Sequence, residues 1–351
     1  MIIPATDLKH ALKKLQPVKT DVFRFDAGTI VAQDSDAIVV VPGPKFEGAF
    51  NTNSKKLSAI INRMSGQIEI TQQEKSIVLK SAKARVELEI QPVKPVTLPS
   101  FPTPSVEFKL SEFKKALALA VSSASTAKSA AFGGSVQLQS LPLGLEDTTP
   151  RGYRIVGTDS IVLTVVTVLE PVPFDMKGLL NLTAASIVQI MDGDKLEIGE
   201  SDTHLQIRSG TTTVYASKPV QAYPNFDVLL AKKPSIKVGF KSAEWLNALR
   251  TVEPLIDEEK DGGRVSLQFR ENVVQFLNVG IGNTASDEAS YEQLEPDDPF
   301  ETKEFSLKLT AKYLSGFLSK AGSDATLGVT DLPVRLESDN VVMLTMPGGK
   351  K

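Results

Sequence analysis

One amphipathic helical pattern occurs three times along this chain of 351 residues, and the repetition constrains the fold more than any other feature. Each copy begins with Ser or Thr near an acidic residue, which favours a helix N-terminus. Apolar residues then follow at i, i+3, i+4 and i+7. The copies are TDLKHALKKL from Thr6, SEFKKALALA from Ser111 and SAEWLNALRT from Ser242, with Thr6, Ser111 and Ser242 as expected N-caps.

A second helical pattern also occurs three times, later in each unit. The copies are TNSKKLSAIINRM from Thr52, LTAASIVQIM from Leu182 and LTAKYLSGFL from Leu309. Each follows a short apolar run that predicts a strand, and each precedes a turn and two alternating runs that predict antiparallel strands. The chain is therefore expected to be α+β, built as three copies of one unit, each with two helices.

Two segments separate the copies: a Pro-rich stretch from Pro92 to Pro104, and the run Ala231–Pro234. We therefore predict three domains at 1–104, 105–231 and 232–351, which agrees with the domain number expected from the length. Three unrelated helix pairs would be the alternative. The matched phase of all six helices and of their flanking strands argues against it.

The composition excludes several classes of protein. There is no Cys, and the two histidines are His10 and His204, so thiol catalysis, disulfides and Cys/His zinc sites are excluded. The N-terminal sequence lacks the order of a signal peptide, and the longest apolar-rich stretch, Ile161 to Leu169, is half a membrane span. We expect a soluble, cytoplasmic protein.

Several motifs resemble catalytic, cofactor or metal sites, but each lacks a neighbouring feature that such a site requires. Gly280, Gly282 and Ala285 match a dinucleotide-binding pattern, but no amphipathic helix follows them. His204 has no Ser or Asp partner at a recognisable spacing, and His10 lies among lysines on a helical surface, which favours a phosphate contact over catalysis. We therefore expect no enzyme activity, no cofactor and no metal site. Three acidic groups lack the spacing of an EF-hand and are expected to be solvated turns: Asp192/Asp194, Asp257–Glu259 and Asp297/Asp298.

Basic residues gather on the non-apolar sides of five of the six predicted helices, although the formal net charge of the chain is −3. Beyond the first turn these sides carry no acids; the helix that begins at Thr183 is the exception, without basic residues. For a single helix, a solvated outer face would explain the pattern, but its recurrence favours a shared phosphate-binding surface. The residues are Lys9, His10, Lys13, Lys14, Lys55, Lys56, Arg63, Lys114, Lys115, Arg250, Lys312 and Lys320.

The chain resembles the bacterial-type DNA sliding clamps, the DNA polymerase III beta subunit family, along essentially its whole length. The most specific stretch runs from Leu179 to Leu230 and includes the helix, the turn Met191–Gly193 and the Tyr-Pro-x-Phe linker Tyr223–Phe226. Upstream, GTDSIVL at Gly157–Leu163 resembles the family's Ala-Thr-Asp-Gly-His-Arg-Leu. The ending VVMLTMPGGKK is similar to the family's Val-Met-Pro-Met-Arg-Leu.

The resemblance implies three repeated domains with inner helices and outer sheets, closed head to tail as a homodimeric ring around double-stranded DNA. It implies a joint between edge strands of the first and third domains, and a pocket for partner peptides between the second and third. The joint positions are Phe108, Leu110, Leu255 and Ile256, for which core packing is an open alternative. The pocket positions are Thr158, Ile161, Val162, Leu163, Pro333, Leu344 and Met346, of which Leu163 and Met346 have the same alternative.

The sequence departs from the family at the implied pocket. Ser160, Ile161 and Val162 replace Gly-His-Arg, Ala231 replaces a usual proline, and Gly348–Lys351 replaces the final Met-Arg-Leu. These changes remove polar groups that would meet a glutamine side chain, so the pocket is expected to prefer hydrophobic anchors. They also suggest a divergent clamp, such as one carried by a virus or mobile element.

The expected function is that of a processivity factor that holds the replicative polymerase on DNA. Its other expected partners are a clamp loader and further replication or repair proteins, and its expected location is the cytoplasm of a bacterial cell or an infected bacterial host. A clamp-fold adaptor that recruits partners without encircling DNA is the alternative, although it would not need the basic helices. A trimeric clamp of two-domain chains disagrees with the three repeats, and a nucleotide-dependent enzyme lacks its site.

Overall fold

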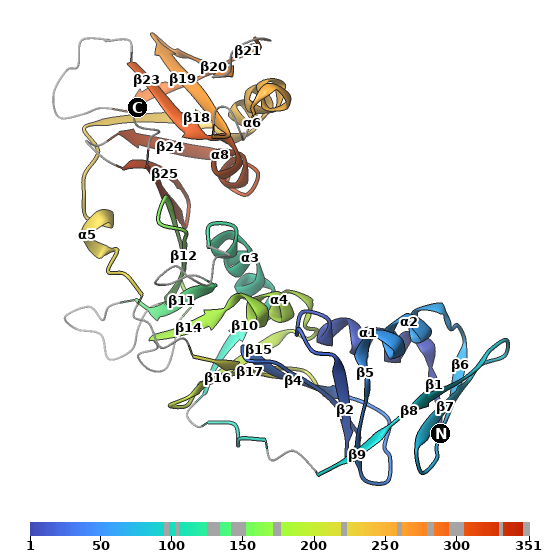
Figure 1. Cartoon of the computed structure of the whole chain (residues 1–351). Helices are drawn as coiled ribbons and strands as arrows, with labels where there is room; N and C mark the ends of the chain where they lie inside the picture. The colour runs from blue at the N-terminus through green and yellow to red at the C-terminus, as the bar shows by residue number, and fades with distance from the viewer. Residues whose placement is uncertain are drawn as a thin grey trace. The chain divides into compact units, whose positions relative to one another are not determined.

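A computed structural model describes most of the chain as two compact units (Figure 1). The first unit comprises Met1–Lys114 and Val172–Val220, and the second comprises Lys115–Pro171 and Gln221–Lys351. The described residues are 1–94, 98–102, 105–124, 134–141, 152–170, 177–218, 223–257, 262–278, 284–294, 305–329 and 333–346. Gly280 and Gly282 lie outside them, as do Asp297, Asp298 and 347–351. The predicted boundaries at 104/105 and 231/232 remain predictions.

The first unit contains two antiparallel sheets and the helices α1 (Ala5–Leu15), α2 (Ser54–Arg63) and α4 (Leu182–Ile190). The small sheet has the order β1-β6-β7-β8, and the large sheet has the order β10-β15-β16-β17-β4-β3-β2-β5-β9. The strands are β1 (Ile2–Pro4), β2 (Val22–Asp26), β3 (Thr29–Gln33), β4 (Ala37–Pro42), β5 (Ala49–Asn53), β6 (Gln67–Gln72), β7 (Ser76–Lys80), β8 (Arg85–Glu89), β9 (Gln91–Val93), β10 (Ser105–Lys109), β14 (Lys177–Asn181), β15 (Lys195–Glu200), β16 (His204–Ser209) and β17 (Thr212–Ser217).

The second unit has the same kind of architecture around α6 (Ser242–Val252) and α8 (Ala311–Leu318). One sheet includes the order β11-β12-β13-β26-β25-β24-β18-β22, and the other has the order β21-β20-β19-β23. The helix α3 (Leu110–Val121) begins in the first unit and ends in the second. The strands and short helices are β11 (Ser135–Ser140), β12 (Tyr153–Thr158), β13 (Val162–Val168), α5 (Asp227–Leu230), β18 (Ile236–Lys241), η1 (Glu253–Leu255), β19 (Arg264–Arg270), β20 (Val273–Asn278), β21 (Ser286–Ser290), β22 (Glu292–Leu294), β23 (Phe305–Thr310), β24 (Asp324–Val329), β25 (Val334–Ser338) and β26 (Val341–Thr345).

The order of elements repeats three times, which confirms the α+β fold class. Each repeat begins with a strand that leads directly into its first helix: β1 into α1, β10 into α3 and β18 into α6. A second strand and helix follow later in each repeat, β5 and α2, β14 and α4, β23 and α8, and three hairpin-connected strands come after each second helix. All six predicted helices are present.

The beginnings of the first helices differ from the prediction. Thr6 and Ser111 lie inside their helices, and no side chain caps α1 or α6. The residues directly before the three first helices are Pro4, Lys109 and Lys241, and none of their side chains has an oxygen that could accept from the helical N–H groups. A backbone contact satisfies the first helical N–H instead: Ala5 donates to Gly66 O at 2.8 Å, Leu110 to Asp194 O at 2.9 Å, and Ser242 to Ser323 O at 3.0 Å.

The second helices of the first two repeats do have side-chain caps. The Asn53 side chain accepts from Lys56 N at 2.9 Å, and the Asn181 side chain accepts from Ala184 N at 2.8 Å. An Asn oxygen at this position satisfies one N–H that the helix itself leaves unpaired. The N-termini of α2 and α4 are therefore fixed by the neighbouring Asn side chain. The first helix of each repeat depends instead on a turn that is distant in the sequence.

The predicted apolar stripes form the core beneath the helices. Trp245 of α6 is fully buried; its ring stacks on Phe240 at 3.7 Å, and its indole N–H donates to Ser290 O at 3.1 Å. In the first unit, Figure 1 shows α1 and α2 side by side. Burial of their leucines and isoleucines leaves the opposite helix faces to the polar residues.

Close backbone packing fixes α3 against β12 in the second repeat. A Cβ placed on Gly157 would lie 1.8 Å from the carbonyl oxygen of Ala120. Only glycine therefore fits at this point of the GTDSIVL motif. No helix in the described part of the chain is long and apolar enough to cross a membrane.

Candidate nucleic-acid surface and partner-binding surface

Most of the basic residues predicted to contact phosphate lie exposed on helices. Exposed positions are His10, Lys13, Lys55, Lys56, Arg63, Lys115, Arg250, Lys312 and Lys320, while Lys9 and Lys114 are partly buried. Lys55 pairs with Asp21 at 2.9 Å, but both side chains are more than four-fifths exposed, so solvent weakens the pair. Eight of the twelve basic residues are thus exposed on α1, α2, α3, α6 or α8, and Lys320 is exposed just after the end of α8.

Lys14 is the exception, because its side chain is buried. Its ammonium group lies 2.6 Å from the Asp192 carboxylate and donates to Thr212 Oγ1 at 3.2 Å. With only 5% of the residue exposed, Lys14 holds α1 to the turn after α4 and is poorly placed for a phosphate contact. Periodicity places Lys14 on the polar side of α1, but it does not show that another segment covers that side.

A histidine and a second lysine meet the same turn. His10 Nε2 pairs with the Asp192 carboxylate, and Lys114 Nζ donates to the backbone oxygen of Met191 at 2.5 Å. The Asp192 backbone oxygen accepts from Ser209 Oγ at 2.7 Å, which fixes the turn itself. Asp192, expected to be a solvated turn residue, is in fact the anionic centre of this cluster. The feature of the sequence that could have indicated this role of Asp192 is the absence of basic residues on α4.

The local charges shift the pKa values of two groups in this cluster. Hydrogen bonds from Lys14 and then His10 hold the pKa of Asp192 below its ordinary value of 3.8. Burial is the main cause that lowers the pKa of Lys114, and the nearby Asp192 charge opposes that effect. The carboxylate of Asp192 is therefore ionised wherever the protein is folded near neutral pH.

A cavity of about 780 Å³ lies beside this cluster, also in the first unit. His10, Lys14 and Thr211 line it together with apolar residues of β1 and α1 and the segment that follows β4. No group of three or more His, Asp or Glu residues in the described ranges is arranged to hold a metal ion.

The predicted partner pocket lies in the second unit, where β13 and β26 pair. Leu163 lies opposite Leu344 in this pairing, and both are buried in one apolar cluster with Val156, Val165 and Phe226. Thr158, Val162 and Pro333 are buried as well. Ile161 and Met346 are 53% and 45% exposed, and their backbones are joined by a hydrogen bond of 3.0 Å. The pocket residues therefore divide into a buried floor and an exposed apolar pair.

The chain itself covers part of this floor. The Tyr223 hydroxyl donates to Val156 O at 3.0 Å, and Phe226 packs under the guanidinium of Arg154, 5.1 Å from the ring centre. Arg154 also lies 3.0 Å from the Asp227 carboxylate, and Arg335 donates to Leu230 O at 2.7 Å. The segment from Tyr223 to Leu230 is thus fastened to β12 and β25.

Sequence reasoning missed two exposed apolar residues on this segment. Val228 and Leu229 of α5 are 66% and 39% exposed, while the neighbouring Leu230 packs against the buried floor. Large apolar side chains that gather on a surface mark interaction sites. The candidate partner-binding surface therefore consists of two exposed apolar pairs, Ile161 with Met346 and Val228 with Leu229, each close in sequence to residues of the buried floor.

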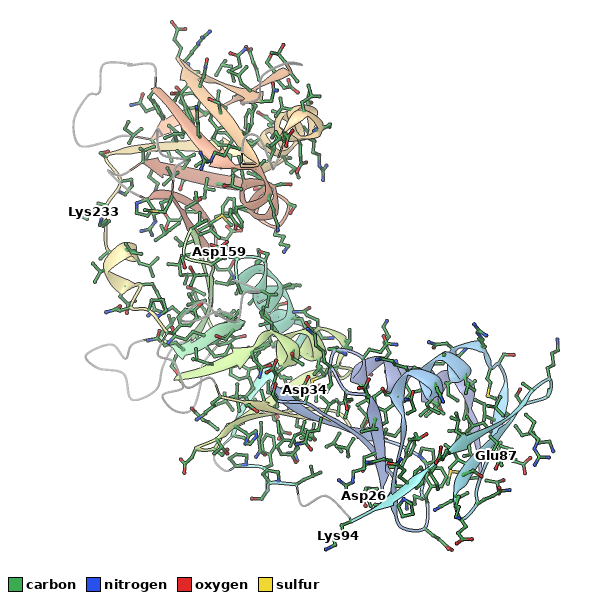
Figure 2. The ribbon with its side chains drawn as sticks, viewed as in Figure 1. Asp26, Asp34, Glu87, Lys94, Asp159 and Lys233 are labelled. Atoms are coloured by element: carbon green, nitrogen blue, oxygen red, sulfur yellow. The ribbon has the colours of Figure 1, made fainter. Side chains whose placement is uncertain are left out.

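The turn between β12 and β13 carries a strained residue. Ser160 has a φ of +81°, in the left-handed region where the family pattern has glycine. Asp159, labelled in Figure 2, stabilises the turn by accepting from Ile161 N at 2.9 Å and Val162 N at 2.8 Å. Tyr313 of α8 also donates to the Asp159 carboxylate. The turn keeps its shape through Asp159 despite the loss of glycine.

The four residues predicted at a subunit joint differ in how deeply they are buried within the single chain. Phe108 and Leu110 are 1% and 2% exposed within the single chain, so packing in the core already explains them. Leu255 and Ile256 are only half-buried, at η1 and directly after it. Unpaired sheet edges are present elsewhere: β8 is at one end of its sheet, and β21 is at one end of its sheet.

The pKa of Asp192 predicts how stability depends on pH. The carboxylate stabilises the fold above its ordinary pKa of 3.8, and this contribution is lost as the pH falls through the lower pKa of the folded state. Asp192→Asn should therefore melt below wild type at pH 5, and the difference should shrink towards zero on acidification. Thermal melts of both proteins test this, with Asp194→Asn as the control. An undiminished difference at the lowest pH would contradict it.

Solved structures match the chain along its whole length, although no sequence-family model and no curated protein sequence matches it. A putative DNA polymerase III beta subunit from Eubacterium rectale gives a TM-score of 0.85 at 12% identity, covering 99% of both chains. The subunit from Thermotoga maritima gives 0.84 at 14%, covering 100% of this chain and 99% of that one. The Helicobacter pylori beta clamp bound to a DNA ligase peptide gives 0.79 at 17%, covering 99% of both. The chain thus has the fold of the bacterial sliding clamps, at low sequence identity.

Proposed function

We propose that the protein is a DNA sliding clamp: two copies close into a ring around duplex DNA and hold a replicative polymerase there. The observation that carries the proposal is the clamp fold over the whole chain together with exposed cations on α1, α2, α3 and α8. We place it in the cytoplasm of a bacterial cell or an infected bacterial host. In this role the protein has no catalytic activity; retention depends on topology.

The helical cations suit weak contacts with DNA. Lysine is a flexible point charge towards phosphate, whereas paired Arg, Asn and Gln side chains that read bases would hold the ring at one sequence. Of the nine exposed cations, most are lysines. Binding should follow counterion release and weaken steeply as salt rises, while the closed ring prevents dissociation.

The ring model predicts that the protein remains on nicked circular DNA and leaves it when the DNA is cut. A closed circle offers no end from which the ring can slide, whereas a linear duplex offers two. Gel filtration of the complex before and after cleavage measures this retention. Equal retention on both forms would contradict encirclement and favour the clamp-fold adaptor that does not surround DNA.

A charge-reversal variant provides the control for the helical cations. Changing Lys9, Lys13, Lys56 and Lys115 to Glu should reduce retention on circular DNA at low salt. The matched variant changes four exposed lysines on strands and loops, Lys75, Lys94, Lys233 and Lys308, and alters the net charge equally. Lys94 and Lys233 are labelled in Figure 2. Equal loss in both variants would show that net charge, and not the helical surface, governs binding.

We propose that β8 of one copy pairs with β21 of its partner at the joint. β8, on which Figure 2 labels Glu87, spans five residues and has β7 as its neighbour; the other edge of its sheet, β1, spans three and includes Pro4. An unpaired edge readily accepts a strand from another chain. β21 packs against α6, and Leu255 and Ile256 follow that helix, which supports this edge for the third repeat.

Leu255→Lys or Ile256→Lys should therefore yield a folded monomer, because an unpaired charge buried in a joint is strongly unfavourable. Size-exclusion chromatography with light scattering measures the mass, and circular dichroism verifies the fold. Leu169→Lys serves as control, since Leu169 is 78% exposed in the single chain and outside the proposed joint. A variant at 255 or 256 that still forms dimers would exclude these residues from the joint.

Partner proteins are proposed to bind the surface of Ile161, Met346, Val228 and Leu229. The Helicobacter pylori clamp was solved with a DNA ligase peptide, which supports peptide binding by this fold. The polymerase, the clamp loader and repair proteins are the expected partners. The surface offers apolar side chains, so we expect hydrophobic anchors to contribute most of the binding energy.

Ile161→Ala combined with Met346→Ala should weaken binding of a hydrophobic clamp-binding peptide, by roughly tenfold if the pair together supplies about 1.4 kcal/mol. Fluorescence anisotropy of the labelled peptide measures affinity. Both side chains are exposed, so the fold should persist, in contrast to truncation of the buried Leu344. Leu169→Ala is the matched control. Unchanged affinity in the double variant would show that the peptide binds elsewhere.

A further inference from the structure

The turn after α4 neutralises part of the basic surface. The Asp192 carboxylate pairs with His10 and with Lys14 at 2.6 Å, and Lys114 donates to the adjacent Met191 carbonyl. Three of the twelve basic residues that were predicted to contact phosphate are therefore already bound to an oxygen atom of this turn. The helix before the turn, α4, contributes no cation of its own.

The two partners of Asp192 differ in accessibility. Lys14 is buried and also donates to Thr212, so it keeps its contacts with Asp192 and Thr212 when DNA is present. The side chains of His10 and Asp192 are 53% and 58% exposed. The His10 to Asp192 contact is thus open to competition from solution. The cavity of about 780 Å³ that His10 and Lys14 line leaves room beside them.

A carboxylate and a DNA phosphate are both oxyanions that accept hydrogen bonds from the same cationic donors. A phosphate near α1 and the Asp192 carboxylate therefore compete for His10, and the negative charge of Asp192 repels phosphate at short range. A ring that slides benefits from this competition, since each firm phosphate contact adds to the barrier against movement along DNA.

We propose that Asp192 is a built-in competitor for DNA phosphate, which holds His10 and so weakens the grip of the first repeat on DNA. The inference rests on the proposed function, because it concerns DNA bound along the same helices. It makes Asp192 a residue that tunes mobility, in addition to its structural contact with Lys14.

The inference predicts tighter and more salt-dependent binding by Asp192→Asn. In a titration at pH 5.5, where an unperturbed imidazole is mostly protonated, release of His10 for one phosphate should steepen the slope of log affinity against log salt by about 0.9. The advantage of the variant over wild type should then shrink about 3.5-fold between 50 and 200 mM salt, as that slope requires. Anisotropy of a labelled 30-base-pair duplex, titrated with full-length protein, measures both quantities.

Two variants separate a local contact from a general charge effect. Asp194→Asn removes the same charge from the same turn, but the Asp194 side chain makes no hydrogen bond or ion pair in the described part of the chain. It should leave the slope unchanged. Adding His10→Gln to Asp192→Asn should remove the extra slope, because the released group is gone. Thermal melts record the structural contribution of Asp192 separately.

The outcomes are distinct. A steeper slope in Asp192→Asn that His10→Gln reverses supports the inference, while equal slopes in the Asp192 and Asp194 variants overturn it. If wild type shows no salt-dependent binding to duplex DNA, the proposed function fails as well. Should Asp192→Asn not fold, single variants in wild type decide: His10→Gln should leave the slope unchanged, whereas the exposed Lys13→Gln should lower it by about 0.9. A slope that falls with His10→Gln would overturn the inference.

Discussion

The architecture depends on one backbone contact made three times. In each repeat, the first residue of the first helix donates its N–H to a carbonyl in the turn after the second helix: Ala5 to Gly66, Leu110 to Asp194 and Ser242 to Ser323. Pro4, Lys109 and Lys241 precede these helices and offer no side-chain oxygen as a cap, so the first N–H groups need another acceptor. The contact thus fixes the first helix relative to the second, and both helices then present their polar faces together.

The same turn serves two purposes in the second repeat. Asp194 supplies the carbonyl that starts α3, and Asp192, two residues earlier, supplies the carboxylate that pairs with α1. The turn therefore links the helices of two successive repeats within the first unit. The helix α4 carries no basic residue of its own, and the basic side chains that meet the turn after it come from α1 and α3.

Periodicity predicted all six helices and the α+β fold class, because an apolar stripe must face a core in any structure of this kind. It did not predict the burial of Lys14, since a helical pattern defines which residues share a face but not what covers that face. The expected Thr6 cap was wrong for a similar reason: whether a strand continues into a helix depends on tertiary contacts. At the partner-binding surface, the apolar character of Leu344 and Met346 did not show from the sequence that Leu344 is buried and Met346 exposed.

The fastening of the segment from Tyr223 to Leu230 has a mechanical consequence. A polymerase anchored on α5 and on the turn at Ile161 would transmit any pulling force into the chain at these points. The Tyr223 hydroxyl and Phe226 meet β12, and Arg335 of β25 holds the carbonyl of Leu230. Such a force would be shared between two strands of one sheet and would act across several hydrogen bonds at once. Tyr313 of α8 also donates to Asp159 in the same turn, so part of a force applied at Ile161 would reach a helix that carries Lys312.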